Sequence, residues 1–327
     1  MNRDNALQAS TAFASTSAES LRSTAVRPTP YPPPFARWMI VIALLLGMFL
    51  IALDLTIVAT AIPRITDDYH TIRDVGWYGS GYFLTFAAFQ SAWGKVFKYF
   101  NMKHAFFTAV VIFSVGSLVC ALAPTSMALI IGRALTGVGA AGVTNGVYTI
   151  IACIVPPPQV AMYLALVGMD FSIASVAGPL LGGVFTETLS WRWCFWINLP
   201  IGGASLAVVL FFFKIPSTMT PAKASLREKL LQMDFQGTVL ILSSLVCYML
   251  ALEEGGVRRP WNSSVIIGLL VGSFVLAVLF GIDQWLQGDR AQIVGRIMKR
   301  RTIVGVCAFL VLSVHYFTCN ILALQLT

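Results

Sequence analysis

Apolar residues fill most of the chain in long runs, and short polar or proline-containing links separate one run from the next. A helix rises 1.5 Å per residue, so about 20 apolar residues cross the roughly 30 Å hydrocarbon core of a bilayer. The pattern predicts nine such helices, at residues 38–61, 78–97, 104–124, 127–150, 161–185, 193–213, 235–252, 262–282 and 302–322. The chain is therefore predicted to be an all-α polytopic membrane protein.

The composition agrees with this prediction and excludes the main soluble classes. Hydrophobic residues make up 57% of the 327 residues and charged residues only 11%, and the mean hydropathy is +0.79. A soluble domain carries about 25% charged residues and does not leave so much apolar surface to cover. The six cysteines stand singly and the three histidines lack metal-ligand spacing. We therefore expect neither a disulfide framework nor a metal site.

The Lys and Arg residues indicate which side of the membrane each link faces. Residues 1–36 are rich in Ser, Thr, Ala and Pro and lack the apolar core of a signal peptide, so a disordered cytosolic tail is expected. With this tail in the cytosol, 16 of the 22 Lys and Arg fall in cytosolic segments and five in external ones. The positive-inside rule favours this orientation. In the basic link 214–234, residues 226–233 are expected to form an amphipathic interfacial helix or a solvated linker.

Three charged residues stand out because they lie well away from the ends of predicted spans: Asp54, Arg133 and Asp170. A charge at mid-membrane costs about 2.5–3.5 kcal/mol on insertion scales, so each requires a reason. Counted by helical rise, Asp54 lies roughly 10 Å and Arg133 roughly 9 Å below the outer surface, so the two are level and can pair. Three alternatives stay open: a proton-and-substrate switch in which Asp54 titrates beside Arg133, a static ion pair, and an Asp54 hydrated at the interface.

Asp170 lies near the midplane, and no basic residue remains in the spans to pair with it. We expect it either to face water, as a second titratable or cation-binding carboxylate, or to stay protonated.

Glycines recur at close spacing in two of the predicted spans. In the span 127–150 they predict close approach of neighbouring helices, and in the span 161–185 a glycine–proline pair predicts a kink. The residues are Gly132, Gly137, Gly139, Gly142 and Gly146 in the first, and Gly178, Pro179, Gly182 and Gly183 in the second.

Several segments together resemble motifs of the major facilitator superfamily, in its fourteen-span drug:proton antiporter branch of fungal multidrug and toxin efflux proteins. They are LDLTIVATAIP at 53–63, IGRALTGVG at 131–139, GPLLGG at 178–183, WRWCFWINLPIG at 191–202 and DFQG at 234–237. The resemblance implies that Asp54 and Arg133 serve proton coupling. Asp170 departs from the family, whose members carry an uncharged residue there, and it is a further candidate only because it is an intramembrane charge. It also implies that Gly178, Pro179, Gly182 and Gly183 form the motif of antiporters.

The resemblance further implies a domain organisation. Residues 37–214 are expected to form an N-terminal six-helix bundle, residues 215–301 the basic cytosolic loops with two linker spans, and residues 302–327 the first helix of an incomplete C-terminal bundle. Family members hold substrate between two bundles near the midplane. The sequence is therefore expected to be a C-terminally truncated member that lacks five spans.

The loop after the second span departs from the family motif. The motif has a glycine, an acid and then basic residues, whereas here Lys98 holds the place of the acid and only Gly94, Lys95 and Lys103 keep the framework. The usual latch between that acid and a helix dipole is therefore in doubt, although the basic loop can still meet anionic lipid.

The implied function is proton-coupled antiport, by alternating access, of small lipophilic or cationic compounds out of the cell. The implied partners are substrate, protons and the lipid bilayer, without nucleic acid, metal or cofactor. The plasma membrane is expected, with the vacuolar membrane as an alternative. Other functions stay open: a non-transporting or homodimeric half, an uptake facilitator, and an intramembrane protease using Asp54 and Asp170 as a carboxylate pair.

Overall fold

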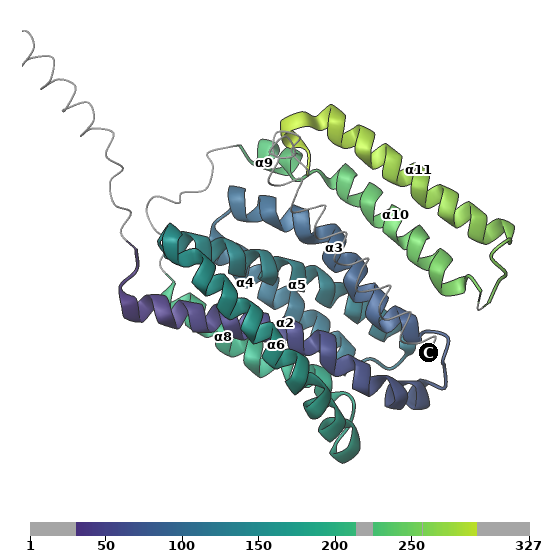
Figure 1. The fold of residues 1–327 in the computed structure, drawn as a ribbon, viewed down its shortest axis with the longest axis horizontal. Helices are drawn as coiled ribbons and strands as arrows, with labels where there is room; N and C mark the ends of the chain where they lie inside the picture. Colours follow the sequence, from purple (N-terminus) through teal and green to yellow (C-terminus); the bar gives the residue numbers. More distant parts are fainter. Residues whose placement is uncertain (1–30, 214–224, 257, 293–327) are drawn as a thin grey trace, which may run out of the picture.

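The computed structural model describes residues 31–213, 225–256 and 258–292. In this part of the chain the structure is helical and contains no β-strand (Figure 1). The helices are α2 (Pro34–Tyr69), α3 (Val75–Tyr99), α4 (Met102–Ala121), α5 (Ser126–Ile154), α6 (Pro157–Thr188), α7 (Trp193–Trp196), α8 (Asn198–Phe212), α9 (Leu226–Gln232), α10 (Phe235–Glu254) and α11 (Ser264–Gln287), and a 3₁₀ turn follows at Gly288–Arg290. The predicted all-α class is confirmed. The predicted ninth span, 302–322, and most of the tail lie outside the described residues.

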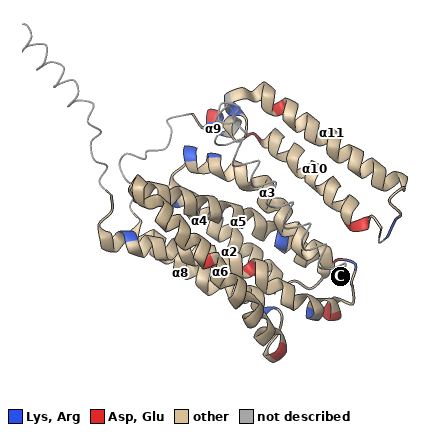
Figure 2. Cartoon of the chain, viewed as in Figure 1, with Lys and Arg blue, Asp and Glu red and all other residues tan. Residues whose placement is uncertain are grey.

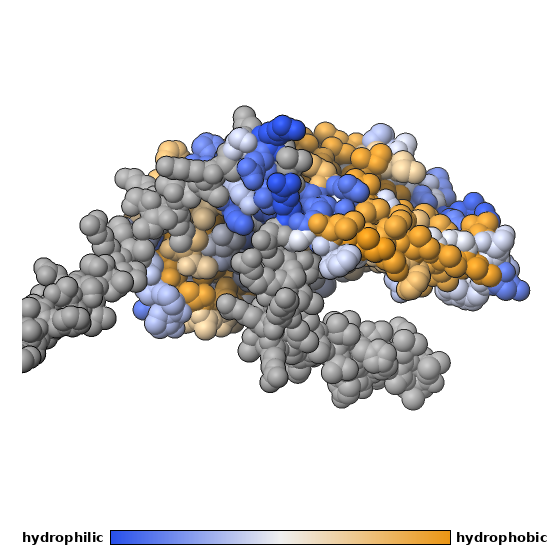
Figure 3. Space-filling view, turned by 90° about the horizontal axis from the view of Figure 1, so that it is seen from above, coloured by the Kyte–Doolittle hydropathy of each residue, from blue (hydrophilic) through white to orange (hydrophobic). Residues whose placement is uncertain are grey.

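Seven segments in the described ranges are long and apolar enough to cross a membrane. They are α2, α4, α5, α6, α7 with α8, α10 and α11. Figure 2 shows most charged residues near helix ends, and Figure 3 shows broad apolar surface on the helices. The multi-pass membrane protein predicted from the sequence is confirmed in this part of the chain.

The eighth predicted span in this part, 78–97, lies in α3, which is not one of the seven. At 25 residues α3 is long enough, but it carries lysines, glycines and several polar residues, so it is less apolar than the others. It lies between α5 and α10 and contacts both (Figure 1). Burial against protein therefore takes the place of lipid contact for much of this helix.

Two helix boundaries differ from the prediction. Helix α2 is longer than the predicted span 38–61, because it continues through Pro63 into a polar segment. The predicted span 193–213 is divided at Ile197 into α7 and α8. Pro200 lies in the first turn of α8, where a residue without an N–H is tolerated, so the chain can start a new helix here.

Helices α2 to α8 form one packed bundle, and α10 and α11 form a pair at its side next to α3 (Figure 1). Within the bundle α5 packs against α3 and α4, and α2 packs against α6 and α8. A large apolar core at one end includes Phe106 and Phe113, and a smaller one at the other includes Trp191 and Phe195. Charged side chains buried between these two cores form the site described next.

Candidate functional site

Asp54 and Arg133 meet in the middle of the bundle. Arg133 Nη1 donates to Asp54 Oδ2 at 2.5 Å, and the side chains are 2% and 0% exposed. The predicted pairing of α2 and α5 at one level is therefore confirmed. The alternative of an Asp54 hydrated at the interface is wrong, because the bundle encloses the carboxylate completely.

Arg133 is held at two further points. Its Nε donates to the backbone oxygen of Tyr78 at 2.9 Å, and its guanidinium lies 4.5 Å from the centre of the Tyr82 ring. A buried charge is tolerated only when counter-charge, hydrogen bonds and polarisable neighbours replace its water. Arg133 thus keeps partners on α3 that do not depend on Asp54.

A buried asparagine completes the surroundings of the carboxylate. Asn198 Nδ2, at the start of α8, donates to Asp54 Oδ1 at 3.0 Å and to Ser117 Oγ of α4 at 3.2 Å. Asn198 and Ser117 are both fully buried. Each oxygen of Asp54 therefore accepts a hydrogen bond, as suits a carboxylate that carries no proton. Asn198 lies in the motif 191–202, and its signal in the sequence is an amide within an apolar span.

Glycines of α5 allow the contact that brings Arg133 to α3. A Cβ at Gly137 would collide with the backbone of Tyr82, and a Cβ at Gly139 would collide with the backbone of Phe113 on α4. The predicted close approach at small residues is confirmed. The backbones on both sides of α5 lie so near that any side chain at these positions forces the helices apart.

The segment 178–183 divides into two faces. Gly178 and Gly182 lie against α2, where an added Cβ would collide with Thr56 and with Thr60 respectively. Gly183 has nothing within 4 Å of the position of a Cβ. Helix α6 runs unbroken through Pro179. Two of the four predicted residues therefore set the contact with the helix that carries Asp54, and the antiporter role of all four stays a prediction.

Asp170 is not brought together with Asp54, whose oxygens are taken by Arg133 and Asn198. Its Oδ2 is buried and has no hydrogen-bond partner among the described residues. It lies three residues after Val167 and four before Ala174, both buried residues of α6. The carboxylate pair of an aspartic protease is therefore contradicted, and Asp170 stays a separate candidate.

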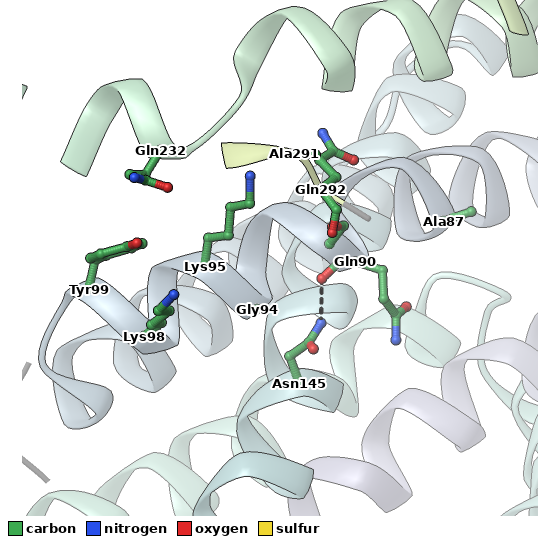
Figure 4. A pocket seen from close by; sticks show the side chains of 11 residues that line it. Ala87, Gln90, Gly94, Lys95, Lys98, Tyr99, Asn145, Gln232, Ala291 and Gln292 are labelled. Atoms are coloured by element: carbon green, nitrogen blue, oxygen red, sulfur yellow. Dashed lines mark hydrogen bonds between the residues drawn. The ribbon is translucent and has the colours of Figure 1, made fainter. Parts of the chain in front are cut away.

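The residues predicted to form a cytosolic loop motif lie in helices instead, with Gly94, Lys95 and Lys98 at the end of α3 and Lys103 at the start of α4. A pocket of about 450 Å³ lies beside the end of α3 (Figure 4). Gly94, Lys95 and Lys98 of α3 line this pocket together with Asn145 of α5 and Gln292. Lys95 Nζ donates to the backbone oxygen of Arg290 at 2.6 Å.

The other two lysines of the motif, Lys98 and Lys103, have different surroundings. Lys98 lies 5.1 Å from the centre of the Tyr99 ring. Lys103 donates to the backbone oxygen of Leu210 at 2.5 Å, which ties the start of α4 to the end of α8. Lys95 and Lys103 therefore bind backbone of neighbouring segments, whereas Lys98 contacts an adjacent ring, and contact of these lysines with lipid is untested.

An acid near Lys95 joins α10 to α11. Asp234 precedes α10 and accepts from Gly237 N at 2.8 Å, Gln284 Nε2 at 2.7 Å and Gln287 Nε2 at 2.6 Å. Burial acts to raise the pKa of Asp234, but these three hydrogen bonds, with a smaller contribution from Lys95, hold the pKa below its usual value. An acid on the α10–α11 pair thus lies near the loop in which Lys98 replaces the acid of the family motif.

The tryptophan-rich segment, residues 191–196, connects neighbouring elements at the opposite end of the bundle. Trp191 Nε1 donates to Asp68 Oδ2 at 2.8 Å, and Arg192 Nη1 lies 3.2 Å from the same oxygen. Arg192 stacks 4.3 Å from the Trp191 ring and donates to the backbone oxygen of Ala123 at 3.2 Å. These contacts join the end of α2, the α4–α5 link and α7.

No group of three or more His, Cys, Asp or Glu that could hold a metal ion occurs in the ranges that the structure describes.

Comparisons with known proteins give one matching family and several similar proteins. Residues 44–323 match the Major Facilitator Superfamily. The chain is 46% identical over 273 residues to the MFS-type transporter grgE of a Penicillium species, covering 84% of this chain and 48% of that protein. It is 47% identical over 289 residues to the probable efflux pump gsfJ of Penicillium aethiopicum, covering 88% of this chain and 51% of that protein. These relatives are named as transporters and pumps rather than enzymes, and the chain spans about half of their length.

The fold has a relative among solved structures. The human organic anion transporter MFSD10 (TETRAN) aligns with a TM-score of 0.51 at 17% identity, covering 72% of this chain and 59% of that one. The likeness in fold agrees with the sequence match, which extends over most of the chain. The chain belongs to the Major Facilitator Superfamily.

Proposed function

We propose that this chain works in a proton-coupled efflux transporter of small lipophilic compounds, such as drugs, toxins or secondary metabolites. The observation that carries the proposal is the buried pair of Asp54 and Arg133 at the centre of the bundle. A buried ion pair is weak evidence for a role in stability, because its replacement by apolar residues of similar size is often neutral or stabilising. Its position inside a membrane protein favours a role in moving charge. The relatives named as efflux pumps support the direction of transport.

In the proposed cycle, Asp54 takes up a proton from the outer side and becomes neutral. The attraction to Arg133 is then lost, while Arg133 keeps its bonds to Tyr78 and Tyr82. Contacts between α2 and α5 weaken, which favours release of substrate and return of the carrier. Once the proton leaves, Arg133 again holds the carboxylate between cycles.

The substrate site is proposed to lie on apolar and aromatic surface facing a second bundle, because family members bind between two bundles. Asp170 is the carboxylate of α6 that would favour a cationic substrate. The plasma membrane is the proposed location, with the vacuolar membrane as the alternative. The proton gradient is the proposed driving force, without a bound cofactor.

The test is pH-driven transport of a fluorescent lipophilic cation, in liposomes, by the protein as the cell produces it, because the proposed substrate site faces a second bundle. We expect transport by the natural sequence and none by Asp54→Asn, because an amide cannot exchange the proton. Asp67→Asn makes the same chemical change at an exposed position of α2 and should transport normally. Transport retained by folded Asp54→Asn, or none by the natural sequence, would refute the proposal. Transport in the opposite direction would indicate an uptake facilitator.

A homodimer is a second candidate, favoured by one face of α6. Val176, Leu180 and Val184 recur every four residues and are 66%, 66% and 54% exposed. Such a stripe suits a substrate cavity or a second copy of the chain. Leu180→Cys should crosslink to itself in membranes if the second copy lies here. A crosslinked dimer without flux would favour the non-transporting alternative.

A further inference from the structure

Asn198 has an unusual set of hydrogen bonds for a fully buried amide. Its nitrogen makes two, to Asp54 Oδ1 and Ser117 Oγ, while its oxygen has no partner among the described residues. A buried acceptor without a partner costs free energy, so an arrangement that keeps one calls for a reason.

The charge of Asp54 supplies that reason. An amide group can turn by 180° and exchange the places of its oxygen and nitrogen. With Asp54 as a carboxylate, turning would set two acceptors against each other. With Asp54 protonated, the amide oxygen would accept from the new O–H, and the Ser117 hydroxyl can serve either orientation, because it both donates and accepts.

The groups around Asp54 offer no stronger acceptor for the new proton. Arg133 of α5 only donates, and Tyr82 of α3 stacks on it. Cys120 of α4 and Cys194 of α7 are the neighbouring thiols, and both are buried.

Helix α6 also packs against α2, and its charged residue on this face is Asp170. The contact beside Asp54 is made by uncharged groups, such as Thr56 Oγ1 donating to the backbone oxygen of Ala174 at 3.2 Å. No hydrogen bond between Asp170 and Asp54 occurs in the described part of the chain. The amide oxygen of Asn198 is thus the acceptor closest at hand for a proton on Asp54 Oδ1.

We propose that Asn198 is a positioning residue whose side-chain amide turns over when Asp54 is protonated, so that α8 registers the charge state of α2. The inference rests on the proposed proton coupling at Asp54. The step balances: an O–H bond of hydronium breaks and leaves water, an O–H bond forms at Asp54 Oδ1, and the hydrogen bond from Asn198 Nδ2 is replaced by one to Asn198 Oδ1. Asn198 lies directly after the α7–α8 junction at Ile197, where the turning amide can shift the start of α8.

The test is infrared difference spectroscopy of the chain in lipid nanodiscs as the pH is lowered, with isotope-labelled asparagine. The carbonyl band of protonated Asp54 is identified by its absence in Asp54→Asn, and the amide band of Asn198 by its absence in Asn198→Leu. We expect the Asn198 carbonyl band to move to lower frequency at the same pH at which the Asp54 band appears, because its oxygen gains a hydrogen bond.

A variant series gives a second readout. Asn198→Leu removes the partner of Asp54 in both protonation states, and the bond to the carboxylate is the stronger of the two because it is charge-assisted, so half-protonation of Asp54 should move to higher pH than in the natural sequence. Asn198→Gln keeps an amide and should recover part of this shift. Ser205→Ala is the matched control, since Ser205 is buried on the same face of α8 and donates to Ala43 O at 2.7 Å, away from Asp54. It should leave the pH of half-protonation unchanged.

The outcomes separate this inference from the proposed function. An Asp54 band that titrates while the Asn198 band stays fixed would overturn the inference and leave proton coupling standing. An Asp54 band that never appears would overturn both. If Asn198→Leu does not fold, the band of Asn198 in the natural sequence, assigned through Asn198→Gln, still decides.

Discussion

The buried pair of Asp54 and Arg133 allows a prediction of stability with a defined magnitude. Arg133→Met keeps the length of the side chain but leaves Asp54 Oδ2 without a partner in a dry site. Breaking a buried ion pair in this way costs about 3–5 kcal/mol. Asp54→Asn should cost less, because Arg133 keeps the Tyr78 oxygen and the Tyr82 ring.

The double variant Asp54→Asn with Arg133→Met tests the origin of the cost. It leaves no unpaired charge, so its loss of stability should be smaller than the sum of the two single losses by about 2–3 kcal/mol. Since 1.4 kcal/mol is about a tenfold change in an equilibrium constant, this coupling lies well above the usual error of about 0.5 kcal/mol for additivity.

The free energy of unfolding of the natural sequence, the two single variants and the double variant is measured by reversible unfolding in mixed lipid and detergent micelles. Loss of helical circular dichroism reports the unfolding. Asp68→Asn and Arg192→Met serve as the control, because they form an ion pair whose side chains are 52% and 35% exposed, so little coupling is expected. Additive losses for Asp54 and Arg133 would show that the pair carries no coupling, and the reasoning about a charge-dependent contact would fail.

Three further predictions concern packing and the α10–α11 pair. Gly139→Ala should destabilise the bundle by about 1–3 kcal/mol because its Cβ meets backbone of α4, whereas Gly183→Ala has open space and should be neutral, as measured by unfolding in the same micelles. The lowered pKa of Asp234 means that its contribution to stability is complete above its usual value of 3.8 and is lost as the pH falls below it, so the stability difference from Asp234→Asn should shrink on acidification. If the stability difference between the natural sequence and Asp234→Asn grew as the pH fell, the expected direction would be contradicted. Lys95→Met should loosen the turn after α11 and raise hydrogen exchange at residues 288–292, because Lys95 binds Arg290 O, whereas Lys98→Met should not.

Local rules explain why much of the fold was predictable. Hydropathy and the 1.5 Å rise of a helix report span length directly, and seven of the eight spans expected in the described ranges are long and apolar enough. Because the bilayer has a known thickness, the helical rise gives the depth of each residue in its span. On this basis Asp54 and Arg133 are predicted to lie at one depth. The spacing of glycines predicted the close approach of α5 to its neighbours, because the positions that lack a Cβ can be read directly from the sequence.

Hydropathy says less about a helix that is buried against protein. Helix α3 carries more polar residues than the seven apolar segments, and it lies between α5 and α10. The break at Ile197 lies within an apolar run, and its signal was Pro200 rather than any change in hydropathy.

The sequence by itself determined that this is a helical membrane protein with a rare buried acid and base at one level. Only the tertiary structure decided that Asn198 is the second partner of Asp54, beside Arg133, and that Asp170 is not a partner. Residue spacing gives height along a helix, but the rotation of each helix about its axis follows from the packing of all its neighbours. The tight packing of α8 on α2 turns the face of Asn198 and Ser205 inward, and that orientation is what surrounds the carboxylate with donors.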